Sequence, residues 1–280
     1  MASMNAAADL ARRRYFLSSL GGVAGWLLTT GAMLGDPAPA QAGDSPTAST
    51  PARVKSRERF AVINADDLGL SAEIDRGIFE AHDGGIVTST SLVVDGPDAE
   101  AAIQQTRQRP GLGLGIHVAF DGSITWPLGA VQLELDRQLT AFVRLTGGPP
   151  THIDSHHHFH RRFNVARLFL EAGQRYGVPV RGFSEVIYLG GFYGQPEFGR
   201  TDMSRISVDA LVSLLQSLAP GVSEVSCHPG HLRTRPDAVY NREREEELRT
   251  LTDERVKMAI AEAGIRLINY RDYARLVRGA

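Results

Sequence analysis

The sequence contains a single cysteine, Cys227, so no disulfide can form within the chain. Stability must therefore come from a hydrophobic core, even in an oxidising compartment. The sequence also lacks a strong excess of charge of either sign, with a formal net charge of −2 at pH 7. This balance provides no basic surface that would attract nucleic acid or an anionic membrane.

Length and composition predict one large domain. Hydrophobic residues make up 42% of the 280 positions, which is enough for a single well-packed core. Residues 43–57 are rich in Ser, Thr, Pro and Ala without hydrophobic periodicity, as is typical of a flexible leader. Because no internal repeat and no shift in composition divides residues 58–280, we expect one folded domain over this range.

The first 42 residues fit a twin-arginine export signal. Arg13-Arg14-Tyr15-Phe16-Leu17 is followed by an uncharged, Gly-rich stretch and by the small-residue cleavage pattern Ala40-Gln41-Ala42. We expect the mature protein to begin at about Gly43 and to be periplasmic or secreted. An uncleaved membrane anchor is the alternative, because residues 17–34 are just long enough to span a bilayer.

Beyond Arg59, short β-branched runs alternate with longer amphipathic stretches. This alternation predicts an α/β fold with a mainly parallel sheet and helices packed outside it. Seven strands favour a barrel of the TIM type with one unit missing over an open sheet. The predicted strands are 60–64, 86–94, 113–118, 151–156, 178–182, 223–228 and 265–268. The predicted helices are 72–83, 97–108, 165–176, 208–218 and 242–263.

Capping residues support several of these boundaries. Ser71, Ser207 and Asn164 are suited to cap the helices that follow them, and Gly177 is suited to end the helix before it. Residues 131–145 fit a helix but also alternate in part, so their structure stays open. We expect the surrounding segment to cover one mouth of the barrel.

Polar motifs stand at the carboxyl ends of four predicted strands. They are Asn64-Ala65-Asp66-Asp67, Gly115-Ile116-His117, Asp154-Ser155-His156 and Cys227-His228-Pro229-Gly230-His231. In a parallel α/β barrel this edge carries the active site, so we expect the motifs to converge. Each motif alone has a simpler explanation: Asp66-Asp67 can cap the next helix, and His117 can be a hydrogen-bonded core histidine.

Five of the nine histidines fall within residues 152–160. Imidazole nitrogens and a carboxylate are the ligands of zinc, or of another divalent ion when water fills the remaining positions. Strand alternation places His152, Asp154 and His156 on one face. There His156 is the natural ligand, and Asp154 is suited to orient a ligand. For the other histidines of this window, a position in a solvated loop is as good an explanation as a role in the site: His157, His158 and His160. Of these, His158 is the best placed to face the cleft.

Five ordered motifs point to a known family. They are Asn-Ala-Asp-Asp-Leu-Gly-Leu-Ser (64–71), Gly-Ile-Val-Thr-Ser-Thr-Ser (85–91), Gly-Ile-His (115–117), Pro-Thr-His-Ile-Asp-Ser-His-His-His (150–158) and Glu-Val-Ser-Cys-His-Pro-Gly (224–230). Together they resemble the YdjC-like carbohydrate deacetylases, which include chitooligosaccharide deacetylases and hopanoid-associated deacetylases. The resemblance covers essentially the whole domain. The stretch between His117 and His152 is shorter than in the diacetylchitobiose enzymes.

The resemblance implies a distorted TIM-like barrel of about seven parallel strands. It also implies a divalent metal, Mg or Zn, that serves to remove N-acetyl groups from a sugar or oligosaccharide. Asp66 would be the general base, and His228 would protonate the leaving nitrogen or stabilise the tetrahedral intermediate. Arg181 is a candidate for orienting Asp66. The implied metal ligands are Asp67, His117 and His156.

Three alternatives remain at the level of sequence. A glycoside hydrolase needs two carboxylates facing each other across a sugar, for which the adjacent Asp66 and Asp67 are poorly placed. Another metallohydrolase, or a periplasmic metal-binding protein without catalysis, would use the same histidines. The sequence leaves open the metal, the natural sugar and the oligomeric state.

Overall fold

The computed structural model describes residues 57–120, 126–197, 199–233 and 239–278. The predicted export signal and nearly all of the predicted leader lie outside these ranges, so their assignment stays a prediction. Within the described ranges, no helix is both long and apolar enough to cross a membrane.

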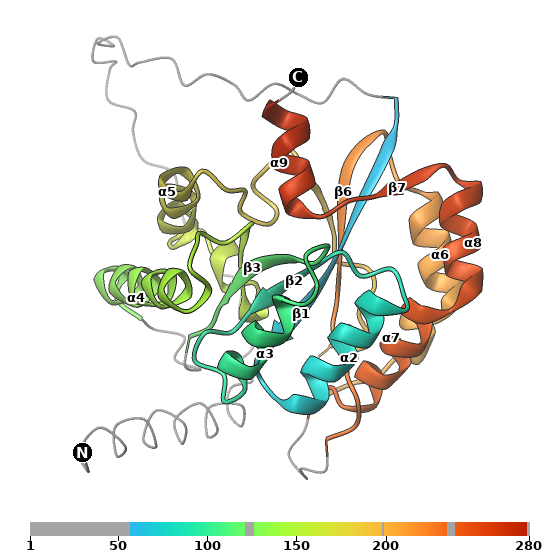
Figure 1. The fold of residues 1–280 in the computed structure, drawn as a ribbon, viewed down its shortest axis with the longest axis horizontal. Coiled ribbons are helices and arrows are strands. Elements are labelled where there is room, and N and C mark those ends of the chain that lie inside the picture. Colours follow the sequence, from blue (N-terminus) through green and yellow to red (C-terminus); the bar gives the residue numbers. More distant parts are fainter. Residues whose placement is uncertain (1–56, 121–125, 198, 234–238, 279–280) are drawn as a thin grey trace, which may run out of the picture. The chain divides into compact units, whose positions relative to one another are not determined.

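The described residues form a curled, seven-stranded parallel sheet (Figure 1). Its order is β4-β3-β2-β1-β6-β5, and β7 pairs with the amino-terminal end of β1. This arrangement confirms the α/β, distorted TIM-like fold class. The strands are β1 (Arg59–Leu68), β2 (Ser89–Leu92), β3 (Gly113–Val118), β4 (Ile153–Ser155), β5 (Ile187–Leu189), β6 (Gly221–Cys227) and β7 (Ile265–Leu267).

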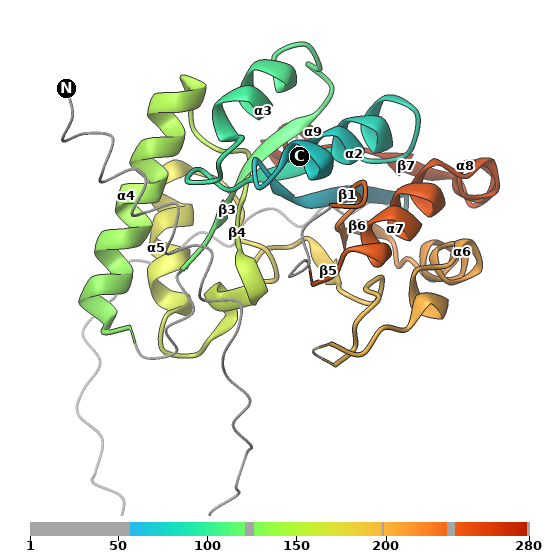
Figure 2. The ribbon, with the colours of Figure 1, turned by 90° about the horizontal axis from the view of Figure 1, so that it is seen from below.

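Helices pack outside this sheet (Figures 1 and 2). In both views α4 and α5 lie side by side near β3 and β4, whereas α6, α7 and α8 lie on the β6 side. The α-helices are α2 (Ala72–Asp83), α3 (Ala99–Thr106), α4 (Leu128–Thr146), α5 (Ala166–Tyr176), α6 (Val208–Gln216), α7 (Arg242–Thr252), α8 (Glu254–Glu262) and α9 (Tyr270–Arg278). The 3-10 helices of the described ranges are η2 (His156–Arg161) and η3 (Met203–Ile206).

Alternation along β1 divides its residues between two environments. Ala61, Ile63 and Ala65 belong to the large core that includes the buried faces of the outer helices. Phe60 and Val62 belong to a smaller cluster with Tyr270 and Tyr273 of α9. Continuing the period of two, Asn64 and Asp66 lie on the same face as Phe60 and Val62, but nearer the carboxyl end. The inner face of the sheet is therefore apolar at one end and polar at the other.

Several predicted boundaries are confirmed by the cap geometry. The hydroxyls of Ser71 and Ser207 accept backbone N–H groups of the first turns of α2 and α6. Gly177 ends α5 with a left-handed φ of 66°. Asn164 is a wrong prediction: α5 begins at Ala166, after Val165, and no described side chain caps it.

Other predicted elements are corrected by the structure. The predicted strand 178–182 is wrong, because this segment makes an isolated bridge between Val180 and Ile153. The fifth strand is instead β5, which the sequence analysis did not find. The predicted helix 242–263 is two helices, separated at Asp253, whose extended backbone and capping side chain start α8. The open segment 131–145 is helical within α4, which packs against β3 outside the sheet.

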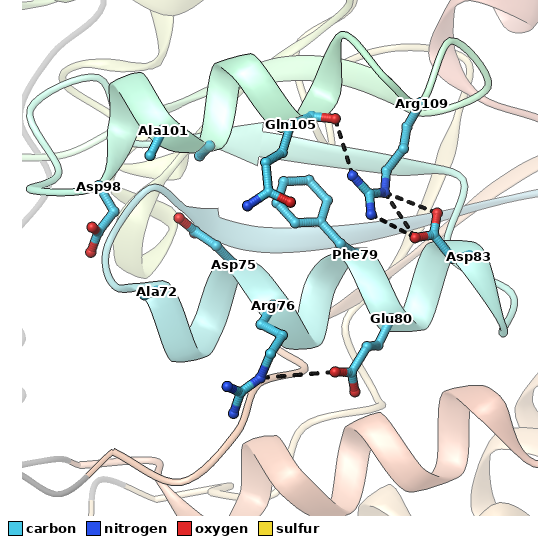
Figure 3. A pocket seen from close by; sticks show the side chains of 11 residues that line it. Ala72, Asp75, Arg76, Phe79, Glu80, Asp83, Asp98, Ala101, Gln105 and Arg109 are labelled. Carbon is cyan, nitrogen blue, oxygen red and sulfur yellow. Dashed lines mark hydrogen bonds and ion pairs between the residues drawn. The ribbon is translucent and has the colours of Figure 1, made fainter.

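A cavity of about 410 Å³ lies between α2 and α3 (Figure 3) and contains none of the predicted site residues. Asp75 on its wall is 4% exposed and accepts the backbone N–H of Gly69 at 2.6 Å. Burial raises the pKa of Asp75 to about 7, although the Gly69 bond opposes the shift. Asp98 and Glu73 raise it further by repulsion. A charged Asp75 therefore opposes folding at neutral pH.

We expect Asp75→Asn to stabilise the protein above pH 7. The folded state binds the Asp75 proton more tightly than the unfolded state, so wild-type stability is lost as pH rises from about 4 to about 7. Asparagine keeps an acceptor for Gly69 and removes the charge. Urea denaturation should show a gain of about 1–3 kcal/mol at pH 8 and little difference near pH 4. Glu100→Gln, an exposed change on α3, is the matched control. An Asp75→Asn effect of equal size at both pH values would contradict the prediction.

Candidate active site

The site begins at an irregularity in β1. The pairing of β1 with β2 shifts register between Ala65 and Leu68, and Asp67 adopts a left-handed φ of 76°. In a regular strand these adjacent side chains would point to opposite faces, whereas here Asp66 Oδ2 and Asp67 Oδ1 lie 4.0 Å and 3.4 Å from the two ring nitrogens of His117. Asp66 is 2% exposed and binds Arg181, whereas Asp67 is 1% exposed and binds Arg244.

Asp67 meets two of the predicted metal ligands. Its Oδ1 lies 3.4 Å from His117 Nε2 and 3.3 Å from His156 Nδ1. Ligand atoms about 2.0–2.2 Å from one zinc ion are separated by roughly 3.4 Å at tetrahedral angles, so the spacing fits a shared ion. Asp67 Oδ1 is buried and has no hydrogen-bond partner among the described residues. A bound cation would satisfy this oxygen. His156 is 36% exposed, which leaves one side of the cluster accessible to solvent.

His117 is held by its other ring nitrogen. Nδ1 lies 2.7 Å from Asp154 Oδ1, which favours the tautomer that presents Nε2 to the metal cluster. Burial lowers the pKa of His117, but Asp154, Asp66 and Asp67 outweigh it and raise the pKa to about 9. Asp154 thus has the orienting position that strand alternation predicted.

A second group of candidate ligands is less suited to a cation. Asp66, His117 and Asp154 also lie close together. Both carboxylates, however, already contact the guanidinium of Arg181 at 2.7 Å. A positive charge therefore occupies this position, and the cluster of Asp67, His117 and His156 fits the metal better.

Arg181 is fully buried and contacts three carboxylates. It donates two parallel hydrogen bonds to Asp66 at 2.7 Å and one to Glu224 at 2.8 Å, and forms an ion pair with Asp154 at 2.7 Å. Burial alone would raise the pKa of Asp66, yet Arg181 keeps it below the usual value. The sequence suggested the contact with Asp66 but gave no sign of the one with Glu224.

His228 lies on the other side of Asp66, with Nε2 3.9 Å from Asp66 Oδ2. Its backbone N–H donates to the buried carboxyl of Glu247, which also accepts the Tyr240 hydroxyl. Burial lowers the pKa of His228 to about 4 and raises that of Glu247 to about 8. Glu247 and Tyr240 were not predicted from the sequence, because neither lies in a strand-end motif.

The loop after His228 packs directly on α2. A Cβ built on Gly77 would lie 2.4 Å from the Cα of Gly230, and Gly230 N donates to Arg244 O at 3.1 Å. Gly77 is therefore required for this close approach of helix and loop, and a Cβ on Gly230 would itself lie 3.2 Å from Arg244 Cδ. The position of His228 follows from it.

The remaining histidines of residues 152–160 have different surroundings. His152 is buried, stacked on Tyr270 at 4.0 Å, and Gly115 leaves the space for its ring. His158 packs against Tyr188, whose hydroxyl lies 3.1 Å from His158 Nε2. His157 is exposed, as the solvated-loop reading predicted. That reading is wrong for His160, which is buried between Ser155 and the carbonyl of Arg181.

A sequence profile described as YdjC-like protein matches residues 61–128 and 123–262. The chain belongs to the YdjC-like family. This confirms the resemblance that the five motifs indicated.

Two named relatives are similar to this YdjC-like chain over nearly their full length. A carbohydrate deacetylase of Geobacillus stearothermophilus is 30% identical over 253 residues, which cover 78% of this chain and 99% of the relative. A chitooligosaccharide deacetylase of Serratia marcescens is 32% identical over 257 residues, with coverages of 77% and 99%.

Solved structures agree on the fold. A crystal structure from Enterococcus faecalis V583, described as a candidate cellobiose-phosphate cleavage protein, has a TM-score of 0.67 and 28% identity. It covers 77% of this YdjC-like chain and 99% of its own. A family 4 carbohydrate esterase of Streptomyces lividans has a TM-score of 0.52 at 13% identity, covering 76% and 93%, and shares the fold.

We expect Arg181→Met to destabilise the protein by about 3–5 kcal/mol, because it leaves three buried carboxylates without their cation. Urea denaturation at pH 7 measures the change. Arg137→Met is the matched control: Arg137 also contacts two carboxylates, but it is 48% exposed, so its loss should cost less than about 1 kcal/mol. If the methionine variant does not fold, Arg181→Lys should show a smaller loss. Equal effects at Arg181 and Arg137 would contradict the prediction.

Proposed function

We propose that this protein is a metal-dependent carbohydrate deacetylase that removes N-acetyl groups from an amino sugar or N-acetylated oligosaccharide. The activity class follows from its named relatives. The observation that carries the metal dependence is the cluster of Asp67, His117 and His156, in which a buried carboxylate oxygen points at two imidazole nitrogens. Two histidines, one carboxylate and water suit zinc, magnesium, manganese or cobalt, so the proposal extends to a divalent ion of any of these kinds.

The proposed site residues would hold the ion through Asp67 Oδ1, His117 Nε2 and His156 Nδ1. When bound, a divalent ion lowers the pKa of water and polarises the acyl oxygen of the substrate. The exposed side of His156 is where water and the acetamide group would enter.

Asp66 is the proposed general base. Its Oδ1 already accepts from Arg181 and Asn64, whereas within the described part of the chain Oδ2 accepts one hydrogen bond, from Arg181 Nη1. A carboxylate oxygen has two lone pairs, so Oδ2 retains one to accept a proton from the attacking water. Arg181 keeps Asp66 ionised and fixes its plane, and both are conditions for a base.

His228 is the proposed acid for the departing nitrogen. Its Nε2 is 3.9 Å from Asp66 Oδ2, so a proton taken by Asp66 has a short path to the imidazole. The lowered pKa makes the protonated imidazole a strong acid, which favours transfer to the leaving amine. Alternatively the same N–H would stabilise the oxyanion of the tetrahedral intermediate.

Acetate release tests this proposal. The purified 43–280 fragment should release acetate from at least one member of a panel that contains N,N′-diacetylchitobiose and simpler N-acetylated sugars. Chelator should abolish the release, and added metal should restore it. Chelator-insensitive cleavage of a glycosidic bond, or a bound metal without release from any substrate, would overturn the proposal.

We expect Asp66→Asn to lower kcat by about 10²–10⁴ while the variant still binds metal, because Asp66 is outside the ligand cluster. Acetate assays and metal analysis on the same preparation check both parts. Asp83→Asn, on the exposed surface of α2, serves as the control and should keep full activity. Loss of the metal together with turnover would place Asp66 among the ligands instead.

We also propose export by the twin-arginine route, supported by the motif at Arg13-Arg14. In cells that express the full chain, the mature protein should fractionate with the periplasm. Replacement of both arginines by lysine should retain the precursor in the cytoplasm. Unchanged fractionation of that variant would refute this route.

A further inference from the structure

The two oxygens of Asp67 have separate roles in the structure. Oδ1 points at His117 and His156 and has no hydrogen-bond partner in the described ranges. Oδ2 accepts a hydrogen bond from Arg244 Nη2 at 2.5 Å. Arg244 is 5% exposed, and this contact spans 177 positions of the sequence. The carboxylate is thus held from the side opposite the proposed metal.

The backbone of Asp67 makes such a partner important. Its φ of 76° is unusual for a residue other than glycine, and no regular strand geometry continues through it. The direction of the carboxylate therefore depends on what its oxygens contact. Arg244 Nη2 is the described side-chain donor that contacts the oxygen facing away from the two histidines.

Arg244 also contacts the loop that carries His228. Its Nη1 donates to the carbonyl of His228 at 3.4 Å, and its own carbonyl accepts the N–H of Gly230 at 3.1 Å. One residue of α7 therefore joins the proposed metal carboxylate to the loop of the proposed acid.

We propose that Arg244 is a positioning residue of the metal site, which fixes Asp67 so that Oδ1 is presented to the ion. This inference rests on the proposed function. Groups that orient a ligand from behind usually contribute 10–100-fold to metal affinity. The positive charge of Arg244 acts in the opposite direction, because it repels a cation. If positioning dominates, removing the Arg244 side chain weakens metal binding. If repulsion dominates, removing it strengthens metal binding.

Titration calorimetry with Co²⁺ or Zn²⁺ tests the proposal on the metal-free protein. We expect the Kd of Arg244→Met to rise about 10–100-fold, and the visible spectrum of bound Co²⁺ to change because Asp67 is no longer held. Arg137→Met, which removes an exposed arginine from two carboxylates, should leave Kd unchanged. Unchanged or tighter binding by a folded Arg244→Met protein overturns the proposal.

A double-variant cycle tests whether Arg244 changes the metal affinity through Asp67. If Arg244 acts through Asp67, then Arg244→Met should change the metal affinity little when Asp67→Asn is already present. Full additivity of the two changes overturns the assignment. If the methionine variant does not fold, Arg244→Lys takes its place. Lysine keeps the charge but lacks the planar fork, so we expect a smaller rise in Kd, and a Kd equal to that of wild type contradicts positioning.

The same measurements distinguish failure of this inference from failure of the proposed function. The proposed metal site itself is refuted if the wild-type protein binds no divalent ion. It is also refuted if Asp67→Asn binds the ion with unchanged affinity. If the wild type binds the ion tightly, Asp67→Asn binds it more weakly and Arg244→Met binds it as the wild type does, only the role of Arg244 is refuted.

Discussion

Buried negative charge is the constraint around which this domain is arranged. Asp66, Asp67, Asp154 and Glu224 are each at most 2% exposed, and an unpaired carboxylate in such surroundings would not remain ionised. Two arginines supply most of the compensation: Arg181 contacts three of the four, and Arg244 contacts Asp67. Asp67 Oδ1 accepts no hydrogen bond from the described residues and faces two imidazole nitrogens, so a cation fits beside it. Structure and proposed chemistry thus follow from the same balance of charge.

The sequence predicted the strand-end residues of the site because strand topology brings them together. Asp66 and Asp67 lie at the carboxyl end of β1 and His117 lies at that of β3. His156 follows β4 and His228 follows β6, so one edge of the parallel sheet collects all five. No strand-end motif or other local sequence pattern predicts that Arg244 and Glu247 belong to the site. Both lie on α7, a helix with charged residues at most positions, and their burial depends on how α7 packs against α2. Local sequence does not contain that information.

Errors in the elements have similar physical causes. Val178–Gly182 has the β-branched composition of a strand, but Gly182 adopts a φ of 72° and the pairing stops after one bridge. The true fifth strand, β5, is three residues long and follows a segment without strand character. Among the dense histidines, His156 was the predicted ligand, and a solvated loop explained His157, His158 and His160 equally well. One of the five, His156, joins the cluster, because the left-handed backbone of His157 and His158 turns the chain away from the strand.

The pairing of β1 with β7 has a consequence for how the domain is made. β7 lies about 200 positions after β1 along the chain, and α9 follows it with the ring of Tyr270, whose hydroxyl donates to Glu224. A nascent chain that lacks these last residues has an unpaired edge at the start of β1 and an uncovered amino end of the sheet. Contacts of such long range are made late, and the segments they join are exposed until then. Both β7 and α9 must therefore leave the ribosome before the amino end of the sheet can be paired and covered.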